Sequence, residues 1–94
     1  MERIIFVEYR IDPGQRDRYL QAAARLVRGQ AHGMLYEGTD QENVFVEQYI
    51  HTTEEQYLQM KRLRLEQESE WDEITDCIIG GRSKLHIWQF VETR

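Results

Sequence analysis

The chain is poor in residues that cross-link or break structure, with one cysteine, one proline and six glycines among 94 residues. A single thiol excludes an internal disulfide, and Cys77, beside the helically spaced Ile74 and Ile78, is expected to be a buried structural residue. The N-terminal apolar run from Ile4 to Val7 is broken by Glu8. It is too short for a signal peptide or a membrane span, so we expect a cytoplasmic protein without a membrane partner.

Basic residues are also scarce, because 12 Lys and Arg face 17 Asp and Glu for a net charge of −5. This balance argues against non-specific nucleic-acid binding, which needs a basic face. No two histidines have local metal-ligand spacing, so no structural metal is expected. The pair Gly80-Gly81 suits a helix end better than a phosphate loop.

The length predicts one domain over residues 1–94, small enough to profit from a partner subunit. The segment Phe6 to Ile11 returns 39 residues later as Phe45 to Ile50. Each copy reads as a strand, and helix start signals follow at Asp12 to Gln15 and at Thr53 to Gln56. The chain therefore contains a strand–helix unit twice, with Glu8 and Glu47 at matching points.

Alternation and turn signals predict strands at 3–11, 32–37, 44–51 and 83–92. Helical spacing predicts helices at 12–28 and 53–79, the second either continuous or divided in two by a break near 67–69. This β-α-β-β-α-β order indicates a ferredoxin-like α+β fold, a four-stranded antiparallel sheet of order 4-1-3-2 with helices on one face.

Strand residues alternate between the two faces of the predicted sheet. We expect an aliphatic set to meet the helices: Ile5, Val7, Val44, Val46, Leu85 and Ile87. The opposite set is aromatic but carries charge: Phe6, Glu8, Arg10, Phe45, Glu47, Tyr49, His86, Trp88 and Phe90, with either Met34 and Tyr36 or Leu35.

An aromatic face this large marks an interface or a ligand site. An RNA-binding sheet would need a Gly-rich, basic third strand, and the strand at 44–51 has no glycine and contains an acid. A membrane-facing sheet is disfavoured by Glu8, Arg10 and Glu47. The pattern favours a homodimer in which two such faces pack together.

Three segments carry a family resemblance: Val7 to Gly14, Gly33 to Glu37 and, most strongly, Val44 to Glu55. The last has apolar residues, an acid, an aromatic residue two places on, and a helix that begins with Thr. The chain resembles the dimeric α+β barrel superfamily, and within it the antibiotic-biosynthesis-monooxygenase-like domains.

The resemblance implies a homodimer with a pocket between the sheet and helices of each subunit, or along the barrel interior. Some members oxygenate aromatic polyketides without metal or flavin, some degrade haem, some isomerise or cyclise small metabolites, and many have no known activity. Glu47 and Tyr49 match the signature acid and aromatic, which in the family hold the pocket together or line it.

The sequence departs from the family pattern at two places that concern haem binding. The second helix, at Tyr57 to Arg64, lacks the histidine that many family sequences place there. The first strand has Glu8 or Tyr9 where haem-degrading relatives use Asn. Haem is therefore disfavoured, and we expect no cofactor.

Candidate proton-transfer residues are Glu8, Glu47 and His86. If Glu8 and Glu47 lie at equivalent heights on parallel central strands, their repulsion raises at least one pKa and makes an acid/base pair. The favoured alternative is that Arg10 with Arg82 or Lys84 neutralises them in a charge network between subunits. His86 could act as a base near a carboxylate, or be a hydrogen-bonded structural residue.

Candidate ligand-binding residues are Tyr36, Phe45, Tyr49 and Trp88, which could form an aromatic wall for a flat molecule. They could equally fill a barrel that has no ligand. Two hypotheses follow. One is a cofactor-independent monooxygenase-like protein that binds a small aromatic or quinone-type molecule. The other is a non-catalytic homodimer that acts as a small-ligand-binding or interaction module.

Overall fold

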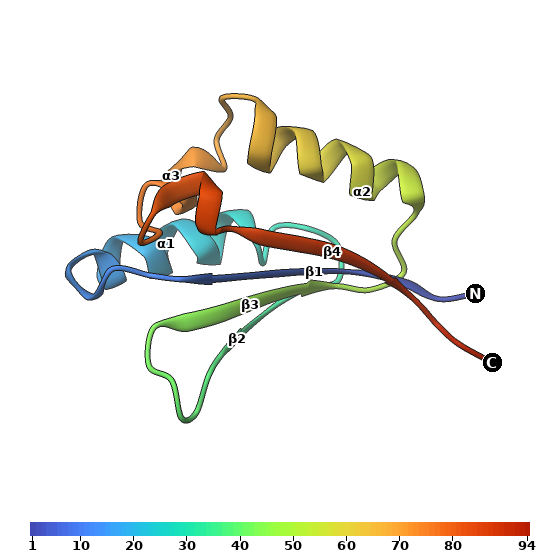
Figure 1. The fold of residues 1–94 in the computed structure, drawn as a ribbon, viewed down its shortest axis with the longest axis horizontal. Helices are drawn as coiled ribbons and strands as arrows, with labels where there is room; N and C mark the ends of the chain where they lie inside the picture. The colour runs from blue at the N-terminus through green and yellow to red at the C-terminus, as the bar shows by residue number, and fades with distance from the viewer.

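A four-stranded sheet with helices on one face forms the fold of residues 1–94 in the computed structural model (Figure 1). Its strands are β1 (Arg3–Arg10), β2 (Gly33–Glu37), β3 (Val44–Tyr49) and β4 (His86–Val91). They lie in the order β2-β3-β1-β4, and every neighbouring pair is antiparallel. This is the 4-1-3-2 order read from the other edge, so the predicted ferredoxin-like α+β fold is confirmed.

The first crossover contains α1 (Arg16–Leu26), which follows a short 3-10 turn at Pro13–Gln15. Asp12 accepts a hydrogen bond from the Gly14 amide at 2.9 Å, so it caps the turn alone rather than in a capping box with Gln15. The helix buries one face against the sheet, including Tyr19, Ala22, Ala23 and Leu26.

The second crossover contains α2 (Glu54–Lys61), a π-helical turn (Arg62–Glu66) and the short α3 (Asp72–Thr75). A capping box starts α2: the Gln56 amide donates to the Thr53 hydroxyl, and the Thr53 amide donates to the Gln56 side chain. The chain leaves the helix at Gln67, which is extended. The predicted break near 67–69 is confirmed, although the helical region ends before 79.

The segment before β4 forms a tight turn rather than strand. Gly80 and Gly81 both have positive φ, 86° and 67°, which glycine adopts without steric cost. A 3-10 turn at Gly81–Lys84 follows, so β4 begins at His86 and not at 83 as the sequence suggested.

The helix-covered face of the sheet differs from the predicted one in β3. In β1 the buried residues are Ile5, Val7 and Tyr9. In β3 they are Phe45, Glu47 and Tyr49, and not Val44 and Val46 as expected. The expected phase of β3 was therefore wrong by one residue, because the buried positions repeat at a spacing of 40 rather than 39. A one-residue change of phase moves every side chain to the other face.

The two central strands are antiparallel, not parallel as expected for Glu8 and Glu47. Val7 pairs with Glu47 and Glu8 pairs with Val46. Since Glu8 and Glu47 are not on the same face, they do not form the predicted pair of carboxylates.

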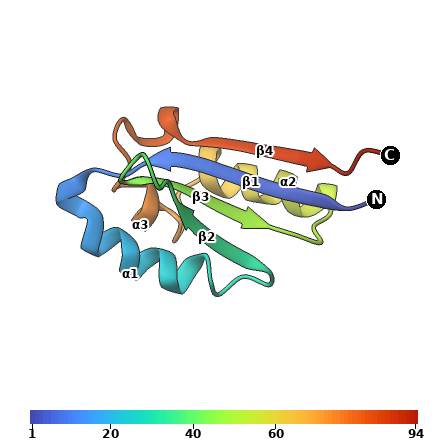
Figure 2. The ribbon, with the colours of Figure 1, turned by 90° about the horizontal axis from the view of Figure 1, so that it is seen from below.

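All helices lie on one side of the sheet, and the other side is uncovered (Figure 2). The two termini lie at the same end of the molecule (Figures 1 and 2). None of the helices combines the length and apolar character that a bilayer crossing requires.

Candidate functional site

A buried ion pair lies at the centre of the helix-covered face. The side chains of Glu47 and Arg64 are both fully buried. Arg64 donates Nη1 to Oε1 and Nη2 to Oε2 of Glu47, each at 2.8 Å. The hydroxyls of Tyr49 and Tyr9 donate to the same two oxygens at 2.5 Å. A carboxylate has about four acceptor positions, so Glu47 is saturated by partners from its own chain.

The electrostatics of this cluster favour the charged pair. Burial by itself would raise the pKa of Glu47, but the charge and hydrogen bonds of Arg64, with the two tyrosine hydroxyls, lower it overall. Burial by itself would lower the pKa of Arg64, but the charge and hydrogen bonds of Glu47, with the two tyrosines, raise it overall. Burial and then the Glu47 charge raise the pKa of Tyr9 and Tyr49. The tyrosines stay protonated donors, and Glu47 is a fixed anion rather than a proton acceptor.

The π-helical turn positions Arg64. The Gln67 amide donates to the Arg62 carbonyl, five residues earlier, at 2.9 Å, which widens the helix at this point. The Arg64 guanidinium lies 4.3 Å from the centre of the Trp71 ring. Its Nε has no hydrogen-bond partner. Sequence analysis missed Arg64. No signal in the sequence pointed to it, because Glu47 was expected on the open face, where a carboxylate needs no buried cation.

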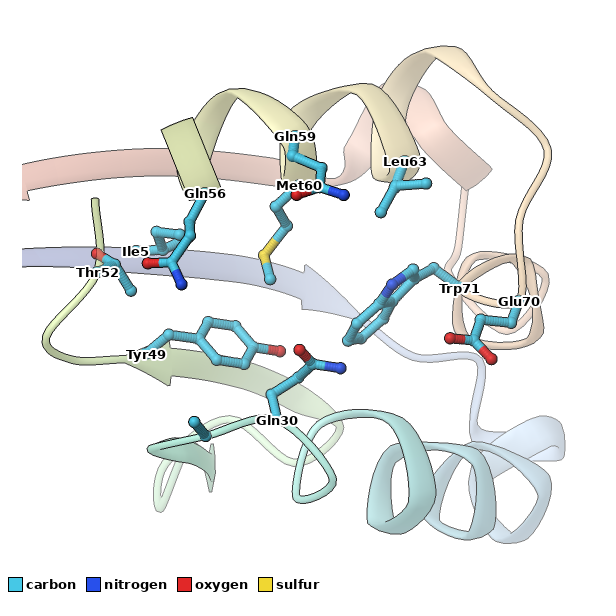
Figure 3. A pocket seen from close by; sticks show the side chains of 11 residues that line it. Ile5, Gln30, Tyr49, Thr52, Gln56, Gln59, Met60, Leu63, Glu70 and Trp71 are labelled. Carbon is cyan, nitrogen blue, oxygen red and sulfur yellow. The ribbon is translucent and has the colours of Figure 1, made fainter. Parts of the chain in front are cut away.

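A pocket of about 280 Å³ opens between α2 and the sheet beside this cluster. Figure 3 shows Tyr49 from β3 and Trp71 from the segment before α3 extending toward each other, with α2 above them. Ile5, Met60 and Leu63 supply most of the remaining apolar wall. The polar lining consists of Gln30, Thr52, Gln56, Gln59 and Glu70.

One arginine connects the two aromatic walls of the pocket. Tyr49 is fixed through Glu47, which Arg64 binds, and Trp71 packs directly against the Arg64 guanidinium. A wall held by buried charge-assisted hydrogen bonds is rigid compared with one held by packing alone. Tyr49 and Trp71 are only 2% and 4% exposed, so both rings are held in place and each presents a small surface to the pocket.

The sheet separates the sequence-predicted site residues into two groups. Glu47, Tyr49 and Phe45 lie on the helix-covered face, whereas Glu8, His86, Tyr36 and Trp88 lie on the open face. Phe45 does not line the pocket. Its ring packs 4.6 Å from that of Tyr19, so it belongs to the core.

The open face brings two predicted residues together. Glu8 is directly opposite His86 in the β1–β4 register. The His86 ring stacks on Trp88 with 5.7 Å between ring centres. Glu8 and His86 border a shallow groove of about 400 Å³ that Tyr9, Arg10 and Lys84 also line. This groove is the only place where two of the three predicted proton-transfer residues meet.

Two solved structures of other proteins have a fold similar to that of this chain. A conserved protein from Methanosarcina mazei Go1 superposes with a TM-score of 0.73 at 9% identity, over 99% of this chain and 94% of that one. A candidate antibiotic biosynthesis monooxygenase from Chloroflexus aurantiacus J-10-fl superposes with a TM-score of 0.54 at 15% identity, over 100% and 95%. The chain thus shares the fold of a monooxygenase-like protein, as the resemblance in the sequence implied.

No protein-family model matches the sequence, and no curated protein matches it. At such low identities, likeness shows a common fold and leaves the activity to be argued from the site.

Proposed function

We propose that this monooxygenase-like chain binds a small aromatic or quinone-type molecule in the pocket between α2 and the sheet. The observation that carries the proposal is the pair of preformed aromatic walls, Tyr49 and Trp71, in a pocket of about 280 Å³. Ligand pockets are typically apolar clefts of roughly 300–1,000 Å³ with a few polar groups. A pocket just below this range suits one or two fused rings.

Isothermal titration calorimetry with naphthohydroquinone, under nitrogen to prevent its oxidation, tests the proposal. We expect saturable heat with one ligand per chain. Met60→Trp fills the pocket and should weaken binding at least about tenfold, because the ligand and the indole compete for the same volume. Leu58→Trp is the matched control, since Leu58 is 45% exposed on the same helix and does not line the pocket. Unchanged binding by Met60→Trp contradicts the pocket.

We propose further that the chain is a homodimer through its open sheet face. Trp88, Phe90, Met34 and Tyr36 are each between 41% and 52% exposed there, which forms an unusually apolar surface. Glu8 and Arg10 lie on the same open face, on the central strand β1. A two-fold axis would let each acid face the base of the other copy. Analytical ultracentrifugation tests this, and a monomer at micromolar concentration contradicts it.

A second candidate function, cofactor-independent oxygenation, is favoured by the Glu8–His86 groove. In the dimer this groove would face the barrel interior, with Trp88, which stacks on His86, beside the substrate ring. For an anthrone-type substrate, a base removes a proton from the CH₂ carbon and the carbanion reduces O₂. One oxygen atom becomes the new carbonyl, and the other leaves as water with the two hydrogens of that carbon.

Oxygen uptake with anthrone distinguishes the two candidates. If the groove is catalytic, His86→Ala and Glu8→Gln should each lower kcat by about a hundredfold or more, as expected for loss of a general base. Met60→Trp should then have no effect. Uptake that survives both groove variants eliminates this candidate and leaves ligand binding as the function.

A further inference from the structure

The charge of the pocket lining has one sign. None of its 11 residues is Lys, Arg or His, and the single ionised group among them is Glu70. The Glu70 side chain is exposed and forms no ion pair or hydrogen bond. The buried Arg64 cannot serve an incoming anion, because its charge is neutralised by Glu47 and covered on one face by Trp71.

The uncharged polar groups suit a different ligand chemistry. The side-chain amides of Gln30 and Gln59 each offer donors and an acceptor, and Gln56, whose oxygen accepts from the Thr53 amide, offers its NH₂ donors. Tyr49 donates its only hydroxyl proton to Glu47, so its oxygen can only accept from a ligand. Ligand hydroxyl groups can therefore donate to Tyr49 or to an amide oxygen, and ligand carbonyl groups can accept from the amides. The lining has no cation that could offset the desolvation of a carboxylate or a phosphate.

From this lining we infer that the pocket selects an uncharged hydroxylated aromatic molecule and rejects its carboxylated or phosphorylated counterpart, with Glu70 as a specificity-determining residue. The inference rests on the proposed function, because it concerns the same pocket. The inference predicts that, of two ligands that differ only in an added carboxylate or phosphate, the uncharged one binds more tightly. The rings enter between Tyr49 and Trp71, and the hydroxyl groups meet the glutamines.

The test compares naphthohydroquinone with the same ring bearing one carboxylate beside a hydroxyl, by calorimetry under nitrogen. The wild-type chain should bind the neutral compound at least about tenfold more tightly, from desolvation of the carboxylate and repulsion by Glu70. Glu70→Lys should narrow this ratio by several-fold. Glu68→Lys, the matched control, changes the net charge equally at a residue outside the pocket lining and should leave the ratio unchanged.

Equal or tighter binding of the carboxylated compound by the wild-type chain overturns the inference and leaves the proposed ligand pocket standing. If Glu70→Lys and Glu68→Lys reduce the affinity ratio of the two compounds equally, the role of Glu70 is overturned, because overall charge would then explain the preference. If neither compound binds, the proposed function fails and the inference fails with it.

Discussion

The two faces of this sheet handle charge in opposite ways. On the helix-covered face Glu47 is fully buried, and each of its oxygens is bound by Arg64 and a tyrosine. On the open face Glu8 has His86 opposite it but no hydrogen bond, and Trp88 is 41% exposed. The chain pairs the buried charge of the helix-covered face with its own residues, and it leaves the charged and aromatic residues of the open face without such partners. We therefore assign ligand binding to the rigid helix-covered face and association with a second copy to the open face.

The largest effect is expected from Arg64→Met, which leaves Glu47 as an uncompensated buried charge. The free energy of unfolding should fall by about 3–5 kcal/mol. Burial then raises the pKa of Glu47 above its unfolded value, so the loss should be greatest at neutral pH and shrink as Glu47 becomes protonated. Urea unfolding followed by circular dichroism measures both.

Controls for this variant use neighbouring and paired substitutions. Arg62→Met, on the exposed side of the same turn, should change stability by less than about 0.5 kcal/mol. The double variant with Glu47→Met should lose less than the sum of the two single variants, because it removes both charges. Strict additivity would mean that the ion pair is not the source of the loss.

The next effect concerns the open face. Trp88→Glu should weaken the proposed dimer by about 2–4 kcal/mol, as for an aromatic interface residue, because each copy would then bury an acid in the interface. Sedimentation velocity over a concentration series measures it. Leu58→Glu, on the outer side of α2, should not change association. If Trp88→Glu and Leu58→Glu changed the dimer affinity equally, the interface would not lie on the open face.

A smaller effect is expected from Tyr9→Phe, which removes one donor from Glu47 and the partner of the Tyr19 hydroxyl. A hydrogen bond to a charged group contributes about 1.5–3 kcal/mol. Tyr36→Phe makes the same chemical change at a side chain 48% exposed on the open face and should have almost no effect on unfolding. Equal losses in urea would remove the distinction between the two faces.

The smallest effect is a pH dependence at the sheet edge. Hydrogen bonds from Arg16 and then from the Asn43 amide lower the pKa of Glu37 to about 2. A depressed pKa stabilises the fold above the unfolded value, and this stability is lost as pH falls from about 4.5 toward 2. Glu37→Gln should therefore be less stable than the wild-type chain at neutral pH and approach it in acid. A stability difference that does not vary with pH would contradict this.

The fold was predictable from local signals, and the site was only partly so. Strand alternation, the Thr53–Gln56 capping box and the glycine pair 80–81 indicated the element order and the helix break. Glu47 could not be placed from sequence, since an acid between Phe45 and Tyr49 looks like an outward residue. Its partner Arg64 comes from a π-helical turn 17 residues away, and no periodicity of 3.6 predicts a turn of that width.

The phase of β3 illustrates the same limit. The matching letters Phe-Val-Glu align Glu8 with Glu47, whereas burial aligns Val7 with Glu47. Apolar periodicity favoured placing Val44 and Val46 inside, because aliphatic residues are the usual choice for a core. The buried ion pair reversed that choice, and only the three-dimensional contact between β3 and the π-helical turn reveals it.

The most direct test of the central claim uses the two tryptophans, one on each face of the sheet. Each indole N–H gives its own signal in a nitrogen-15 heteronuclear correlation spectrum. Titration with naphthohydroquinone should shift the Trp71 signal saturably and leave the Trp88 signal in place, because Trp71 lines the pocket and Trp88 lies on the open face. A shift of Trp88 with Trp71 unmoved would contradict the account and place the ligand on the opposite side of the sheet.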